Sequence, residues 1–240
     1  MELKKKTTFL FFFTICQLCI CQNKLSSKDG FISLDTQSFE GQKPEANWIW
    51  DSGDPNPKNY YLHIRKSFRL NNSIKEAKAY VSAFSFAELY INGEYIDRVP
   101  TNPDPEYQTY EEIDISPYLK SGRNTIAALV YNVGEGLHHR MNGRGGFFFQ
   151  SKIIDSEEKI IKLNSDKSWL VAKAKAWNNK TDHRQIDHTI GRQENYDARL
   201  AYDSWELNHF NDSNWENATE IGVPPIDPWN KILVINRERT

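Results

Sequence analysis

The chain has 240 residues, of which 39% are hydrophobic and 13% aromatic. This length and composition allow one large domain or two small ones, each with a real core. The formal net charge of −2 comes without a clustered basic face and excludes a nucleic-acid partner. All three cysteines lie within the first 21 residues, which removes disulfide, zinc–thiolate and thiol-nucleophile chemistry from the rest of the chain.

The first segment has the pattern of a signal peptide. Lys4–Lys6 supply a positive start, and Phe9–Ile20 form an apolar run that is too short to span a bilayer. The prediction is a signal peptide over 1–21 and a secreted or periplasmic protein with no membrane span. An alternative remains open, because Leu18–Cys21 forms a loose lipoprotein box, in which Cys21 would carry a lipid anchor on the outer surface.

The next stretch, 22–46, is polar and without periodicity, which predicts a flexible leader. From residue 47 onward, short segments with β-type patterns recur at the spacing typical of a sandwich. The expected strands are Tyr60–Leu70 with one buried face, Ala77–Ala83, Asn124–Tyr131 as a central strand, Phe147–Ile154 paired with Lys159–Leu163, and Trp169–Lys173. No segment predicts a long helix, so the fold class is all-β.

Two local signals fix turns. Asn92-Gly93 between two alternating runs predicts a two-residue hairpin, because a type I′ turn needs positive φ at both central positions. Ser116 followed by Pro117 predicts an N-cap and the first residue of a short helical turn.

Five motifs in fixed order carry a family resemblance. They are A-x-A-Y-V-S-A (77–83), E-L-Y-I-N-G (88–93), D-I-S-P-Y-L-K-S-G-x-N-T-I-A (114–127), E-x-Y-D-A-R (194–199) and F-N-D-S-N-W (210–215). Together they resemble the N-terminal, non-catalytic β-sandwich module of bacterial α-L-rhamnosidases. The resemblance implies a galactose-binding-like jelly roll over 47–223, followed by a linker-like tail over 224–240.

In that family, hydrolysis depends on carboxylates in a separate (α/α)₆ barrel, so the resemblance implies no catalytic residue and no cofactor in this chain. The expected role is an accessory or carbohydrate-binding module, whose partner is a glycan, for instance a rhamnose-containing one, or a catalytic glycosidase domain. The alternatives are a stand-alone carbohydrate-binding or surface adhesion protein, and a small lyase or hydrolase that uses Glu135 and His138. Whether the gene product is truncated stays open.

Some members of the resembled module bind rhamnose through calcium, held partly by an acidic residue and an amide just before the E-L-Y-x-N-G strand. Phe84 and Ser85 occupy those places here. A benzyl group offers no ligand and a hydroxyl is a weak substitute for a carboxylate, so the prediction is no metal site.

Candidate site residues come from strand faces and from one glycine-rich loop. The loop, 132–146, combines five glycines with donors and acceptors, so its backbone could approach a ligand or a second domain. An ordinary surface loop is the alternative. The candidates for carbohydrate binding or docking are Glu88, Tyr107, Glu135, His138, His139, Arg140, Arg144 and Trp177. For Glu88 the preferred interpretation is a solvated or salt-bridged strand residue. Glu194, Asp197 and Arg199 could hold a carbohydrate, but the preferred interpretation is an internal salt-bridge network that anchors a long loop.

Overall fold

The computed structural model describes residues 44–99, 108–136, 142–181, 192–229 and 232–235. All of them belong to one compact unit that spans 34–240. The expected signal peptide and nearly all of the expected leader lie outside these ranges. Among the described residues, none of the helical segments has the length and apolar character needed to cross a membrane.

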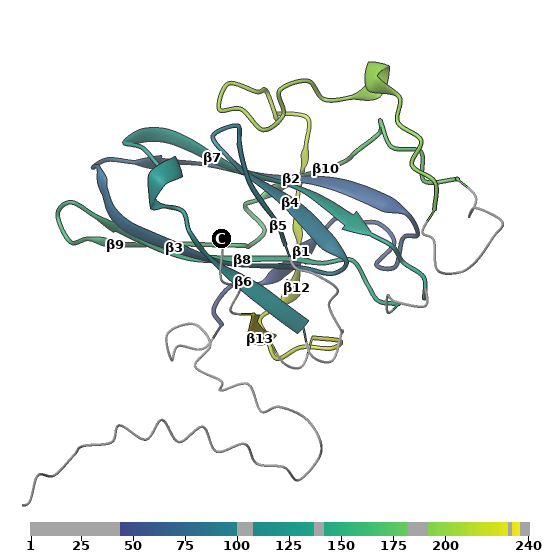
Figure 1. Cartoon of the computed structure of the whole chain (residues 1–240), viewed down its shortest axis with the longest axis horizontal. Coiled ribbons are helices and arrows are strands. Elements are labelled where there is room, and N and C mark those ends of the chain that lie inside the picture. Colours follow the sequence, from purple (N-terminus) through teal and green to yellow (C-terminus); the bar gives the residue numbers. More distant parts are fainter. Residues whose placement is uncertain (1–43, 100–107, 137–141, 182–191, 230–231, 236–240) are drawn as a thin grey trace, which may run out of the picture. The chain divides into compact units, whose positions relative to one another are not determined.

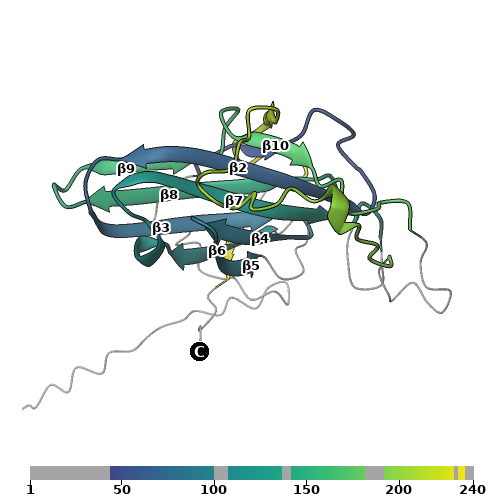
Figure 2. The ribbon, with the colours of Figure 1, turned by 90° about the horizontal axis from the view of Figure 1, so that it is seen from above.

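Two sheets, shown in Figures 1 and 2, form a β-sandwich, which confirms the predicted fold class. In the larger sheet the strand order is β12-β1-β8-β3-β6-β13, and β9 pairs with β8. The smaller sheet has the order β11-β10-β2-β7-β4-β5. The bounds are β1 Trp48–Trp50, β2 Tyr60–Leu70, β3 Ile74–Ala83, β4 Phe86–Ile91, β5 Glu94–Val99, β6 Gln108–Asp114, β7 Gly122–Asn132, β8 Phe147–Asp155, β9 Ile160–Asn164, β10 Leu170–Lys173, β11 Glu216–Asn217, β12 Thr219–Gly222 and β13 Ile232–Ile235.

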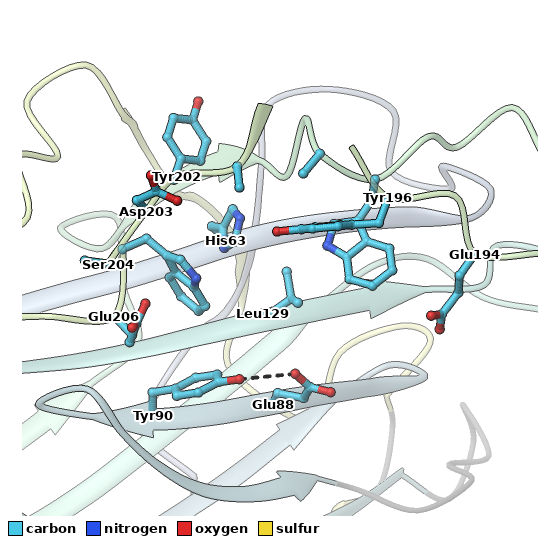
Figure 3. Close-up of a pocket in the computed structure, with 14 residues that line it drawn as sticks. His63, Glu88, Tyr90, Leu129, Glu194, Tyr196, Tyr202, Asp203, Ser204 and Glu206 are labelled. Carbon is cyan, nitrogen blue, oxygen red and sulfur yellow. Dashed lines mark hydrogen bonds between the residues drawn. The ribbon is translucent and has the colours of Figure 1, made fainter. Parts of the chain in front are cut away.

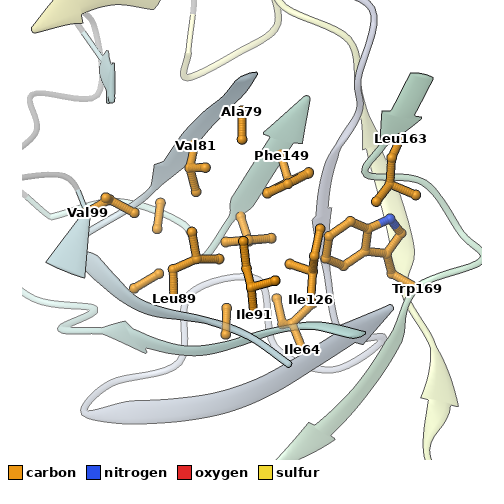
Figure 4. Packing of buried hydrophobic residues seen from close by; sticks show 14 of the residues in the cluster. Ile64, Ala79, Val81, Leu89, Ile91, Val99, Ile126, Phe149, Leu163 and Trp169 are labelled. Atoms are coloured by element: carbon orange, nitrogen blue, oxygen red, sulfur yellow. The ribbon is translucent and has the colours of Figure 1, made fainter. Parts of the chain in front are cut away.

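The main hydrophobic core lies between the sheets (Figure 4). Alternate residues of each strand face it, among them Ile64 of β2, Ile126 of β7 and Val81 of β3, because side chains of a strand point to opposite faces in turn. β7 pairs with β2 on one side and with β4 on the other, so the predicted central strand is confirmed.

The predicted hairpins are confirmed as well. Asn92 and Gly93 have φ of 54° and 89°, and they join β4 to β5. β8 and β9 pair antiparallel along Gln150–Ile154. The expected N-cap role of Ser116 is wrong: the 3₁₀ turn (η2) starts at Ser116 itself, after Ile115. The Ser116 hydroxyl accepts a hydrogen bond from the Ala77 amide at 2.7 Å, so it pairs with the neighbouring strand instead.

The prediction of one buried face for Tyr60–Leu70 is also wrong. On the side away from the main core, Tyr61, His63 and Arg65 of β2 are buried too. Tyr61 belongs to a second apolar cluster on this outer face, together with Phe86 of β4 and Leu129 of β7. Burial of this face needs a covering segment, and that segment builds the candidate site described below.

Residues outside the expected domain limits, 47–223, contact or extend the larger sheet. At the start, the Ala46 amide donates to Gln150 Oε1 at 3.0 Å. After residue 223, Trp229 is fully buried and stacks on Trp48, with ring centroids 4.0 Å apart. β13 then pairs parallel with β6. The segment expected to be a linker-like tail, 224–240, therefore contributes a buried tryptophan and a strand to the sandwich.

Candidate functional site

A cleft of about 660 Å³ lies on the outer face of the smaller sheet (Figure 3). A volume of this size falls within the range of ligand pockets. Strand residues form one side of the cleft, and the other side is formed by a chain segment that crosses the sheet together with Ala176 and Trp177, which follow β10. The described lining residues are His63, Glu88, Tyr90, Leu129, Ala176, Trp177, Glu194, Tyr196, Ala201, Tyr202, Asp203, Ser204, Trp205 and Glu206.

Three adjacent strands place the floor of the cleft. His63 comes from β2, Leu129 from the central strand β7, and Glu88 and Tyr90 from β4 (Figure 3). All four alternate along their strands with residues of the main core and therefore lie on the opposite face of the sheet. The Tyr90 hydroxyl donates to Glu88 Oε2 at 3.3 Å. Burial, together with the nearby Glu88 carboxylate, raises the pKa of Tyr90 to about 12, so this hydroxyl keeps its proton at neutral pH.

The opposite side is the crossing segment, which we define as 192–215, and Arg65 of β2 holds its middle in place. The Arg65 guanidinium donates to the backbone carbonyls of Trp205 and Leu207, and its Nε donates to Asp212 Oδ2 at 3.0 Å. A buried cation needs such partners, because an unpaired charge away from water is strongly unfavourable. The buried arginine therefore fixes the backbone next to the cleft residue Trp205.

The start of the crossing segment is fixed through Arg192. Its Nε donates to Glu135 Oε1 at 2.6 Å and its Nη2 donates to Glu135 Oε2 at 3.1 Å. Two parallel bonds between a guanidinium and a carboxylate give a defined geometry. Arg192 Nη1 also donates to the Thr181 carbonyl at 2.6 Å, so this end is held at two separate places.

The crossing segment is also joined to the residues around Trp177 and to the hairpin turn. The Asp197 amide donates to the Ala176 carbonyl at 2.8 Å. Asn208 Nδ2 donates to Asn92 Oδ1 at 2.9 Å, which connects the segment to the β4–β5 turn. Attachment at several points along its length makes the cleft a preformed feature of the fold.

Aromatic rings form much of the cleft surface. The Trp177 ring stacks on Tyr61 with centroids 4.3 Å apart and an interplanar angle of 14°, and Tyr196 meets it edge-on. The Trp205 ring lies 4.3 Å from His63. Both tryptophans are half-buried, and Tyr196 is 51% exposed. Rings fixed in this way offer apolar surface to a ligand without a further loss of side-chain freedom.

The charged groups that line the cleft are all negative. Four carboxylates line it (Glu88, Glu194, Asp203 and Glu206), and none of its described lining residues is lysine or arginine. His63 does not offset this charge: burial, and then the neighbouring Arg65 cation, lower its pKa to about 3, so its ring is neutral at ordinary pH. The cleft therefore combines neutral hydrogen-bonding groups, aromatic rings and negative charge.

The eight candidate residues from the sequence analysis do not form one site in the structure. Glu88 and Trp177 lie in the cleft. Glu135 does not line it and pairs with Arg192, while Arg144 lies near the Trp229 ring, 6.0 Å from its centroid. The other four candidates, Tyr107, His138, His139 and Arg140, lie outside the described residues.

The charged residues of the E-x-Y-D-A-R motif also lie in two different places. Asp197 pairs with Arg199 at 2.6 Å, and its Oδ1 also accepts the Arg199 amide, which caps the short 3₁₀ turn (η3) at Ala198–Leu200. Glu194 instead lines the cleft together with Tyr196. The expected three-residue network is thus a local two-residue pair, because Asp197 and Arg199 satisfy each other across a single turn.

Sequence reasoning missed several cleft residues, chiefly His63, Tyr90, Tyr202 and Trp205. His63 alternates with the core residues of β2, a pattern that is equally typical of a solvated face. Trp205 follows E-x-Y-D-A-R by six residues, and this closeness was the one available signal. Nothing in the sequence showed that the segment folds back over β2.

The loop before β4 lies apart from the residues that line the cleft. Phe84 is buried with Trp48 and Tyr80 in an apolar cluster, and the Ser85 hydroxyl accepts the Val133 amide at 3.1 Å. Both side chains therefore have structural partners. Across the part of the chain that the structure describes, no group of three or more His, Cys, Asp or Glu side chains has a geometry suited to a metal ion.

The fold and the cleft together define a class: an all-β sandwich of two sheets, with an aromatic and acidic cleft on one outer face. The sequence model of the alpha-L-rhamnosidase N-terminal domain matches residues 72–231, so the chain belongs to this family. An alpha-L-rhamnosidase of Formosa agariphila is 30% identical over 165 residues, which cover 64% of this chain and 17% of that protein.

Solved structures agree with this assignment. The GH78 family rhamnosidase of Bacillus sp. GL1 is 29% identical, with a TM-score of 0.72 over 81% of this chain and 20% of that one. A lectin from Pleurotus ostreatus in complex with GalNAc is 17% identical, with a TM-score of 0.51 over 80% of this chain and 49% of the lectin, and shares the fold alone. The chain thus spans about a fifth of the length of the rhamnosidases that it matches.

Proposed function

We propose that this chain is a non-catalytic accessory module of an α-L-rhamnosidase-like protein, and that it binds a glycan in the cleft between the smaller sheet and the crossing segment. This proposal rests on one observation: aromatic rings and hydrogen-bonding groups lie together in one preformed cleft. Trp177 and Trp205 offer flat apolar surface for the C–H faces of a sugar ring. Glu88, Tyr90 and Glu194 offer polar groups for its hydroxyls.

Family membership supports the link to a glycosidase, and the lectin with GalNAc supports carbohydrate binding by a sandwich of this shape. The proposed partner of the module is a catalytic glycosidase domain. In this proposal the catalytic domain cleaves the glycan, and this module binds the same glycan nearby, which raises the local substrate concentration.

Isothermal titration calorimetry of the purified chain with rhamnose-containing oligosaccharides tests this function. We expect binding that Trp177→Ala and Glu88→Gln weaken at least about tenfold, because they remove a ring and a hydrogen-bonding charge from the cleft. Ile160→Ala is the control, since Ile160 is an exposed side chain of β9 in the other sheet. Circular dichroism and melting curves show whether each variant is folded. Binding that persists unchanged in folded Trp177→Ala and Glu88→Gln would contradict a role for the cleft.

We further propose export, on the basis of the charged start and apolar run within residues 1–21. The mature chain would then be secreted or periplasmic, or held on the outer surface through Cys21. Mass spectrometry of the mature N-terminus distinguishes these outcomes, because cleavage after Cys21 leaves Gln22 first and lipidation leaves a modified Cys21. An intact Met1 start in the exported fraction would contradict both.

A further inference from the structure

The distribution of charge in the cleft leads to a statement about the class of ligand, which rests on the proposed function. We infer that the cleft selects saccharides without acid groups and excludes sulfated and uronic-acid saccharides. The inference rests on the carboxylates of the cleft, on the lack of lysine and arginine among its described lining residues, and on a buried histidine at its floor.

The carboxylates come from both sides of the cleft. Glu88 belongs to the floor, while Glu194, Asp203 and Glu206 belong to the crossing segment. In Figure 3, Glu194 lies at one end of the cleft, and Asp203 and Glu206 lie at the other. An anionic group on a bound ligand would therefore lie near a carboxylate at either end of the cleft. Like charges in contact at a partly dry site are strongly unfavourable.

Among the described residues, two arginines lie near the cleft without lining it. Arg98 of β5 is the cross-strand neighbour of Glu88, but its guanidinium lies 3.6 Å from the centroid of the Phe86 ring and outside the lining. Arg65 is fully buried and bonds to Asp212 and two carbonyls. Proteins that bind sulfate or carboxylate groups present arginine or lysine to them. The described lining of this cleft presents neither.

The side chain of His63 supplies the independent indication of an uncharged, hydroxyl-bearing ligand. His63 is only 6% exposed, lines the floor, and its Nδ1 has no hydrogen-bond partner among the described residues. A buried polar atom without a partner is unusual and favours a ligand or ordered water beside it. A neutral imidazole can both donate and accept, which suits a sugar hydroxyl and not an acid group that needs a cation.

The test compares one oligosaccharide in two forms. The purified chain is titrated with a rhamnose-containing oligosaccharide and with its O-sulfated counterpart at 50 mM and at 500 mM sodium chloride. We expect the unsulfated form to bind at least about tenfold more tightly at low salt, and the difference to shrink at high salt because salt screens exposed charges.

Substitutions of single carboxylates identify which residues cause the preference for the unsulfated saccharide. Glu194→Gln, Asp203→Asn and Glu206→Gln, separately and together, should reduce the preference for the unsulfated form, because each removes a negative charge and keeps the size of the side chain. Glu94→Gln, an exposed carboxylate of β5 outside the lining, should leave the preference unchanged. The ratio of the two affinities is read, so a general loss of binding does not mimic the effect.

The outcomes separate this inference from the proposed function. If neither form binds, the proposed function fails. If both forms bind equally, or the sulfated form binds more tightly, glycan binding stands and the exclusion of acidic saccharides is wrong. A preference that the three substitutions leave intact would also overturn the inference, because the carboxylates of the crossing segment would then not be its cause.

Discussion

Arg65 Nε donates to Asp212 Oδ2 across 3.0 Å, and the Arg65 side chain is completely buried while that of Asp212 is 20% exposed. The two residues are 147 positions apart in sequence, so this ion pair joins β2 to the crossing segment. Because the same guanidinium bonds to the carbonyls of Trp205 and Leu207, it positions one side of the cleft as well as stabilising the fold.

Replacing Arg65 with methionine should lower the free energy of unfolding by about 3–5 kcal/mol. The substitution leaves the Asp212 carboxylate and two carbonyls without their buried partner, and breaking a buried pair on one side costs this much. Urea denaturation measures the change. Arg69→Met, an exposed arginine of the same strand, is the matched control and should cost less than about 1 kcal/mol. Equal losses in the two variants would show that the Arg65 pair does not stabilise the fold.

Gly93→Val should destabilise the protein by roughly 1–3 kcal/mol. Gly93 has a φ of 89°, and a Cβ there would lie 2.1 Å from Leu207 Cδ2 of the crossing segment. Gly122→Val separates the two causes, since Gly122 has a similar φ of 96° but nothing within 4 Å of a Cβ. Thermal melts should show the larger loss for Gly93→Val. Equal melting temperatures would mean that the turn does not pack against Leu207.

Stability should fall as the pH decreases from about 6.5 toward 3, partly through His63. Burial depresses the pKa of His63 in the folded protein to about 3, so the unfolded chain takes up the proton first. The contribution is complete above the unfolded pKa, and about 2 kcal/mol of it is lost between pH 6.5 and pH 5. The groups that contact His63 are the rings of Tyr202, Trp205 and Trp215, with the Arg65 cation near them.

Urea denaturation at pH 7, 6 and 5 checks this expectation, with His63→Gln showing a smaller loss of stability over the range than the unsubstituted protein. His209→Gln is the control, because His209 is exposed. An identical pH dependence in His63→Gln and the unsubstituted protein would contradict the assignment.

Glycan binding should not require calcium. The Phe84 side chain has no oxygen, and the Ser85 hydroxyl is a neutral oxygen that already accepts the Val133 amide, so neither side chain offers calcium the carboxylate that it prefers. Calorimetry with L-rhamnose in 2 mM calcium and again in excess chelator should give the same dissociation constant. Binding that is lost only in chelator would sink this prediction and direct attention to residues beyond the cleft.

The sequence by itself determined the parts of the fold that depend on local chemistry. Asn92-Gly93 predicts its turn because positive φ is easy for those two residues, and the strand at Asn124–Tyr131 predicts its central place because both of its faces are apolar. The motifs in fixed order were enough to indicate the family, since they record the same strands and turns. Glu88 and Trp177 were found because each stands out within its own few residues.

Only the tertiary structure decided the cleft. His63 and Arg65 alternate with the core residues of β2, and local pattern assigns such residues to solvent. They are buried because the crossing segment, more than 120 positions later, folds over them and supplies Trp205 and Asp212. The cleft is made by this long-range contact, with strand residues on one side and the crossing segment on the other. Hydrophobic periodicity reports which face of a strand meets the main core, but it does not report what covers the other face.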